Sequence, residues 1–208
     1  MPDRFAYIGG ILVGTGAVIT AVFQWFKYLG DKKKVSETQH AKSTIKSNNI
    51  NRVINRLVAS IECAKVVSIG IVTNGGHLGD PAKPKYFQII YSTDYNTWAT
   101  WNEPAQMEMD GITIHGATLE DGKCVFKASQ IKKPLVREWY ESNGMTQTSS
   151  HLIAIDEIKG TSIVMLINYT TEFVIPPAMN QVIKLHLIEL ADIFRPNGWF
   201  AKKNFITP

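Results

Sequence analysis

The chain has 208 residues, of which 45% are hydrophobic and 19% are charged, and this composition excludes both a disordered chain and a polytopic membrane protein. The length suffices for one domain with an appendage, and two cysteines exclude a disulfide-stapled scaffold. The net charge is +4, but its distribution excludes a general nucleic-acid surface. The whole excess lies within residues 27–46, while residues 47–208 hold 15 basic and 15 acidic side chains.

An uncharged segment of 22 residues, 5–26, stands near the start of the chain. At about 1.5 Å per residue, a helix of this length spans the roughly 30 Å hydrocarbon core of a bilayer. We therefore predict a transmembrane anchor over residues 1–29. Its aromatic and basic flank is expected at the membrane interface: Trp25, Lys32, Lys33 and Lys34. A cleaved signal peptide and a buried soluble helix are the alternatives, but the first lacks a good cleavage site and the second contains four glycines.

Small residues recur along one face of the predicted anchor at spacings of three and four. They are Ala6, Gly10, Gly14, Ala17 and Ala21. Such a stripe lets two helices approach closely in lipid, so it predicts helix–helix packing and a homo-oligomer. The alternative explanation is the ordinary frequency of glycine in membrane helices.

Lysines are concentrated on the C-terminal side of the predicted anchor, with only Arg4 on the N-terminal side. The positive-inside rule then predicts a single-pass protein of the bacterial inner membrane, with the lipid bilayer as a partner and the following domain in the cytoplasm. Residues 30–47 are polar and basic, so we predict a juxtamembrane linker there.

An amphipathic helix is predicted over residues 50–61, because its apolar side chains recur at i, i+3, i+4, i+7, i+8 and i+11. Two strands are expected next, at 65–73 and 86–91, and the first runs into the turn signal Asn74-Gly75-Gly76. Residues 93–110 show no clear period and are predicted to be irregular.

A hairpin is predicted from strands 112–119 and 124–128, with Asp121-Gly122 at its tip. A helix then begins at Pro134, since proline suits the first helical position, and ends at Asn143-Gly144.

A second hairpin is predicted from strands 151–158 and 162–170, and a last helix begins at Pro176-Pro177. Because the strands pair in short hairpins, the expected fold class is α+β, a mainly antiparallel sheet of about six strands flanked by helices. This domain covers residues 48–196, and a C-terminal tail follows at 197–208.

The pattern resembles a GAF-like domain, the fold related to PAS. The likeness rests on the leading helix 50–61, strand 66–73 entering Asn74-Gly75-Gly76-His77, residues 138–144 (Glu-Trp-Tyr-Glu-Ser-Asn-Gly) and the closing helix. It implies a small-molecule pocket or a dimerising signalling module. The ligand motifs of cyclic-nucleotide and chromophore-binding GAF domains have no match in this sequence.

A second resemblance is to the T-type holin of T-even phages, which also joins one membrane helix to a globular α/β domain. That likeness implies a role in host lysis. The sequence departs from it in two respects, because the lysines favour a cytoplasmic domain and the predicted membrane helix begins at residue 5.

No Walker loop, HExxH, GxSxG or paired CxxC motif is present, so we predict a non-enzymatic protein without a cofactor or a metal. Aromatic residues gather after the second strand, and Tyr91, Trp98 and Trp101 are candidates for a pocket lid. Asn74 and His77 are candidates for polar ligand contacts. The alternatives are core packing for the aromatic side chains and a solvated turn for the polar ones.

The leading hypothesis is a membrane-anchored GAF-like interaction or sensory module that binds an unknown small ligand or protein partner. A phage holin or lysis-regulating membrane protein is a second hypothesis, and a virion or membrane scaffold component is a third.

Overall fold

The computed structural model describes residues 47–73, 84–156 and 160–195. The chain divides between Ser47 and Asn48, and the second unit contains nearly all of the described residues. Among them no helix has both the length and the apolar character that crossing a bilayer requires. The predicted anchor and linker lie outside the described residues, as does the tail.

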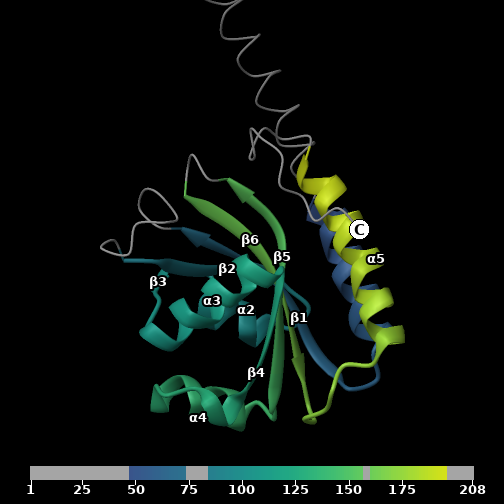
Figure 1. Cartoon of the computed structure of the whole chain (residues 1–208). Coiled ribbons are helices and arrows are strands. Elements are labelled where there is room, and N and C mark those ends of the chain that lie inside the picture. Colours follow the sequence, from purple (N-terminus) through teal and green to yellow (C-terminus); the bar gives the residue numbers. More distant parts are fainter. Residues whose placement is uncertain (1–46, 74–83, 157–159, 196–208) are drawn as a thin grey trace, which may run out of the picture. The chain divides into compact units, whose positions relative to one another are not determined.

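Six strands form one sheet in the order β3-β2-β1-β6-β5-β4, and every neighbouring pair is antiparallel (Figure 1). The strands are β1 (Ala64–Thr73), β2 (Tyr86–Ser92), β3 (Ala105–Gln106), β4 (Lys123–Lys127), β5 (Gln147–Asp156) and β6 (Thr161–Tyr169). The predicted α+β class with an antiparallel sheet is confirmed. Strands β1 and β6 are central, so most of their side chains are buried on both faces.

Two long helices pack on one face of the sheet, a helix over residues 47–60 and α5 (Pro177–Phe194). Their apolar stripes meet alternate side chains of the central strands, including Ile69, Ile163 and Ile167, none of which is exposed. Full burial of each such side chain is worth about 1.5–3 kcal/mol. This face therefore holds the main hydrophobic core, and both helices are where the sequence predicts them.

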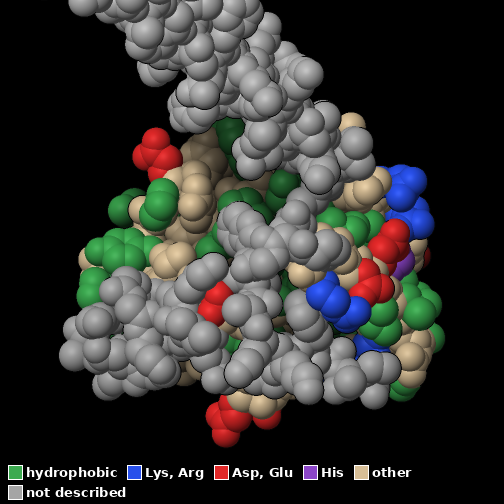
Figure 2. All heavy atoms as spheres, turned by 90° about the horizontal axis from the view of Figure 1, so that it is seen from above, with side chains coloured by type: hydrophobic (Ala, Val, Ile, Leu, Met, Phe, Trp, Pro, Cys, Tyr) green, Lys and Arg blue, Asp and Glu red, His purple; other side chains and the backbone are tan. Residues whose placement is uncertain are grey.

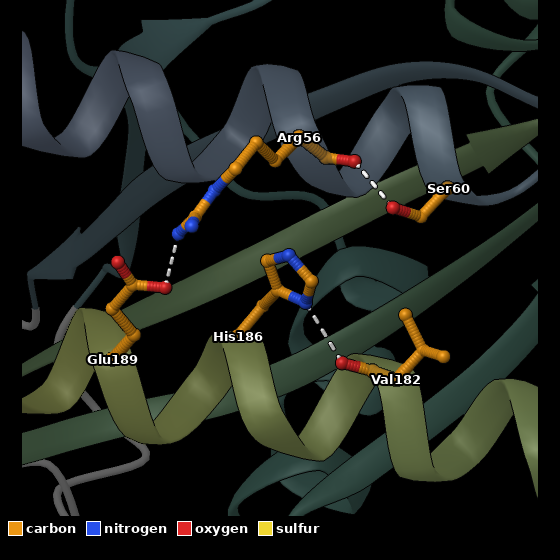
Figure 3. Close-up of polar contacts among 5 residues, drawn as sticks. All are labelled: Arg56, Ser60, Val182, His186 and Glu189. Atoms are coloured by element: carbon orange, nitrogen blue, oxygen red, sulfur yellow. Dashed lines mark hydrogen bonds and ion pairs between the residues drawn. The ribbon is translucent and has the colours of Figure 1, made fainter.

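The two long helices lie side by side, and polar contacts line their outer surface (Figure 3). The Arg56 guanidinium forms an ion pair with Glu189 of α5, and both side chains are partly exposed. The Nδ1–H of His186 donates to the Val182 carbonyl oxygen at 2.9 Å. Basic and acidic side chains are intermixed on this side of the molecule (Figure 2).

Three shorter helices cover the opposite face: α2 (Tyr95–Trp101), α3 (Met109–Asp121) and α4 (Pro134–Ser142) (Figure 1). The predicted bounds of α4 are confirmed, with Gly144 at a φ of 60° just beyond its end. The second predicted hairpin is confirmed as β5 and β6.

The first predicted hairpin is wrong, because residues 112–119 belong to helix α3 rather than to a strand. Gly122 follows the helix at a φ of 72°, where it ends α3 in the left-handed conformation. A glycine after an acidic residue suits both a hairpin tip and a helix end. The buried pair His115 and Thr118 follows the three-residue spacing of a helix face.

The predicted irregular segment, 93–110, is also wrong in part, since it contains α2, β3 and the start of α3. Asp94 caps α2 by accepting a hydrogen bond from the Thr97 N–H at 2.7 Å. The expected number of strands agrees with the observed six, but the two-residue β3 takes the place of the predicted strand 112–119.

Candidate functional site

A cavity of about 230 Å³ lies between the sheet and the three short helices. The sheet provides its floor, chiefly Val72, Phe87, Ile89, Val164 and Leu166. Side chains of α2, α3 and α4 form its walls. The cavity is therefore on the face opposite the two long helices, and the same central strands border both the cavity and the main core.

Close packing of Phe87 against β1 shapes the floor. A Cβ atom at Gly70 would lie 2.3 Å from Cε2 of Phe87, well inside contact distance. Because glycine has no side chain, the ring rests directly on the β1 backbone. The space above the ring remains part of the cavity.

Aromatic side chains from three elements form one wall: Trp101, Phe126, Trp139 and Tyr140. Trp101 and Trp139 pack edge to face, with ring centroids 5.8 Å apart, and Trp139 meets Tyr140 in the same manner at 5.3 Å. Edge-to-face contacts hold aromatic rings in defined orientations. This wall joins α2 to α4 and presents apolar surface to the cavity.

Charged side chains occur in the lining where helices α3 and α4 begin. Lys133 Nζ forms an ion pair with Glu108 Oε1 at 2.8 Å, and 41% and 60% of these two side chains are exposed. Asp110 accepts the backbone N–H groups of Gly111 and Lys132 at 2.9 and 3.0 Å. The exposure of the ion pair places its charges at the solvent side of the lining.

His115 is 3% exposed and borders the cavity from α3. Its Nε2 lies 3.2 Å from the Ser162 hydroxyl. Burial, with a smaller contribution from the positive charge of Lys85, lowers the pKa of His115 from 6.5 to about 4. The imidazole is therefore neutral at pH 7 and can donate or accept through its other nitrogen.

Polar side chains on β5 and β6 also reach the cavity floor. Ser150 and Asn168 line the cavity and are 3% and 2% exposed. The Thr148 hydroxyl donates to Asn168 Oδ1 at 2.6 Å. Burial raises the pKa of Tyr140 above its ordinary value, so its phenol is neutral.

A second polar cluster lies on the opposite face of the same strands. The Ser149 hydroxyl is 2.8 Å from the Tyr169 hydroxyl and 2.9 Å from His151 Nε2, and all three residues are buried. Tyr169 belongs to the main core, and the lining of the cavity includes none of the three. This serine–histidine pair is therefore separated from the cavity by the sheet.

The predicted site residues are placed differently from one another. Trp101 lines the cavity, whereas Trp98 is 36% exposed and packs on Tyr95 with centroids 5.8 Å apart. Tyr91 is half-buried and packs against the main core on the other face. Asn74 and His77 lie outside the described residues, as do the residues predicted for helix packing and for the membrane interface.

Sequence reasoning did not single out His115, Ser150 or Asn168 as cavity residues. One signal in the sequence could have indicated them. Each is a polar residue within a helix or strand that is at least partly buried, and a buried polar side chain needs a hydrogen-bond partner. Within the described ranges, no group of three or more histidine, cysteine, aspartate or glutamate side chains is arranged to hold a metal ion.

Comparison with solved structures identifies the fold as GAF-like. The GAF domain/HD domain protein of Geobacter sulfurreducens superposes with a TM-score of 0.51 at 9% identity, over 71% of this chain and 90% of that one. The GAF domain region of a putative membrane protein from Geobacter sulfurreducens PCA gives a TM-score of 0.48 at 13% identity, over 74% and 95%. No protein-family model and no curated protein matches the chain.

Proposed function

We propose that this protein is a non-enzymatic, membrane-anchored sensory module that binds a small, largely apolar molecule in the cavity above the sheet. The observation that supports the proposal is the cavity itself, about 230 Å³ in volume and lined mainly by aliphatic and aromatic side chains. An engineered apolar cavity of about 150 Å³ takes up benzene. A substituted single ring is therefore of suitable size, and such pockets are the usual form of small-molecule sites.

The arrangement of the sheet supplies a route from the ligand to the rest of the chain. Strand β6 places Val164 and Leu166 on the cavity and Met165 and Ile167 against the two long helices. A ligand that shifts this strand therefore changes the packing of the helix over residues 47–60. That helix directly follows the predicted linker, so a sensory role is consistent with the order of the elements.

Binding in the cavity can be tested by methyl NMR on the full chain with α-methylstyrene as an apolar single-ring probe. We expect saturable shifts of the Val164 and Ile114 methyl signals, because both side chains line the cavity. In Leu166→Trp the larger side chain occupies the space, and the shifts should be lost. The matched control is Leu185→Trp at a position on α5 that is 66% exposed, which should bind as wild type does. Equal binding by wild type and Leu166→Trp would place the probe elsewhere.

The membrane anchor in this proposal rests on the uncharged residues 5–26 and the lysines after them. Reporters active only in the cytoplasm or only in the periplasm, fused after Pro208, test it in a bacterial membrane. We expect a membrane-bound product with cytoplasmic reporter activity. A periplasmic domain with abrupt lysis of the culture would favour the lysis-protein hypothesis, and a product found outside the membrane fraction would contradict the anchor.

A further inference from the structure

Two polar side chains on the cavity floor each have an atom that forms no hydrogen bond among the described residues. Ser150 and Asn168 are nearly fully buried and line the cavity. Among the described residues, no hydrogen bond reaches Ser150 Oγ or Asn168 Nδ2, while Asn168 Oδ1 is satisfied by Thr148. Because both side chains line the cavity, these two atoms are available to hydrogen-bond whatever fills it.

The direction of the hydrogen bonds fixes what Asn168 can recognise. The Thr148 hydroxyl donates to Asn168 Oδ1 at 2.6 Å. This bond uses the carbonyl oxygen of the Asn168 amide, so the N–H donors of the amide remain available. The Ser150 hydroxyl can donate to the same acceptor. The floor therefore offers hydrogen-bond donors to the ligand.

The charges in the lining disfavour an anion as that acceptor. Lys133 is the one cationic side chain in the lining given by the described residues, and it is already paired with Glu108. Asp110 adds a further negative charge, and His115 is neutral at pH 7 because its pKa is lowered to about 4. A buried carboxylate or phosphate without a cation is strongly disfavoured. An uncharged carbonyl oxygen accepts the same hydrogen bonds without that cost.

We propose that the ligand is an uncharged carbonyl compound, a ketone, ester or amide, whose oxygen accepts hydrogen bonds from Asn168 Nδ2 and Ser150 Oγ. Its apolar body lies over Val164 and Leu166, against the aromatic wall. This inference rests on the proposed function, because it names the chemistry of the molecule that occupies the same cavity. Asn168 and Ser150 are then the residues that determine specificity.

The test compares three probes of similar shape on the full chain: acetophenone, α-methylstyrene and benzoate. The first two differ by a carbonyl oxygen in place of a methylene group, and benzoate carries the anion. We expect Ser150→Ala to weaken acetophenone binding about tenfold, the effect of losing one hydrogen bond in a buried site. The affinity for α-methylstyrene should stay within about twofold of wild type, and benzoate should bind at least about tenfold more weakly than acetophenone.

Ser149→Ala is the matched control, since the neighbouring serine lies on the other face and bonds to Tyr169 and His151. It should lower stability but leave the ratio of the acetophenone and α-methylstyrene affinities unchanged. Ser150→Ala removes a hydroxyl without a described partner, so the fold should be retained. The infrared carbonyl stretch of bound acetophenone is an independent measurement, and it should move to higher frequency in Ser150→Ala.

Three results would overturn the inference. In the first, Ser150→Ala weakens the binding of both neutral probes equally. In the second, Ser150→Ala changes neither the carbonyl stretch nor the affinity of acetophenone. In the third, benzoate binds as tightly as acetophenone. Each of these leaves the proposed ligand cavity intact. Failure of acetophenone and α-methylstyrene alike to shift the cavity methyl signals would instead overturn the proposed function, and this inference with it.

Discussion

The two faces of the sheet are built from the same strands but are packed in different ways. On one face, two long helices cover large aliphatic side chains such as Ile163, Met165 and Ile167, all fully buried. On the other face, the longest helix is α3, with 13 residues, and small or polar side chains such as Gly70, Ser150 and Asn168 alternate with aliphatic ones. The first face is closed, and the second encloses a cavity.

The difference shows how one sheet combines a close-packed core with a cavity. Strand alternation sends consecutive residues to opposite faces, so a single strand can satisfy both demands. Small side chains on the cavity face leave volume that short helices do not fill, and close packing on the other face compensates for the weaker dispersion attraction around that volume. Substitutions on the two faces should therefore differ in their effect on stability.

Neighbouring residues of β6 give the largest expected contrast. Ile167→Ala, on the helix-covered face, should lower the free energy of unfolding by about 2–5 kcal/mol, because a fully packed side chain leaves a void. Leu166→Ala, at the cavity, should cost roughly half as much, since its side chain already has empty space on one side. Urea unfolding followed by circular dichroism measures both values.

Arg56→Ala serves as a control from the outer surface of the helix over residues 47–60. Its ion pair with Glu189 is between side chains that are 52% and 38% exposed, so the loss should be below about 1 kcal/mol. If Ile167→Ala and Leu166→Ala lowered the free energy of unfolding by equal amounts, the two faces of the sheet would be equally well packed.

A histidine is buried on each face of the sheet, His115 on the cavity face and His151 on the helix-covered face. We expect both to make the protein less stable in acid. Burial lowers the pKa of both His115 and His151 from 6.5 to about 4. A nearby lysine adds to the shift, Lys85 for His115 and Lys123 for His151. Between pH 6.5 and about 4, the unfolded chain binds more protons than the folded one. The contribution of these histidines to the free energy of unfolding is therefore fully present above pH 6.5 and is lost as the pH falls to about 4. Each histidine contributes roughly 1.4 kcal/mol per pH unit at most.

Substitution sharpens this comparison, because carboxylates also titrate in the same range. His115→Gln and His151→Gln should each flatten the dependence of unfolding free energy on pH, and the double variant should flatten it most. Urea titrations at several pH values between about 4 and 7 give the slopes. A double variant with the slope of wild type would mean that neither histidine is buried in its neutral form.

Local patterns were sufficient for the helix-covered face. The apolar positions of residues 50–61 follow the helical period without a break, and prolines mark the first turns of α4 and α5. The hairpin of β5 and β6 follows from two apolar runs with Gly160, at a φ of 59°, just before the second. In each case the period and the end signals agree, because a face that is buried by long elements repeats over many residues.

The cavity face was predicted less well, for a physical reason. The residues of α3 alternate over a short stretch, so Ile112 and Ile114 suggested a strand, and Gly122 suited a hairpin tip as well as a helix end. Of the aromatic residues proposed for the pocket lid, Trp101 lines the cavity and Trp98 does not. Seven residues of α2 cover too few turns to produce a period that distinguishes its two sides.

The sequence by itself determined the fold class, the two long helices and the central strands, because burial on a long regular element imposes a periodic pattern on the chain. The positions of Ser150, Asn168 and His115 around one cavity were decided only by the tertiary structure. These residues lie on β5, β6 and α3, which are separated along the chain. No local sequence pattern predicts which faces of these three elements pack together. Antiparallel pairing of β5 with β6, and packing of α3 across them, brings the three to the same enclosed space.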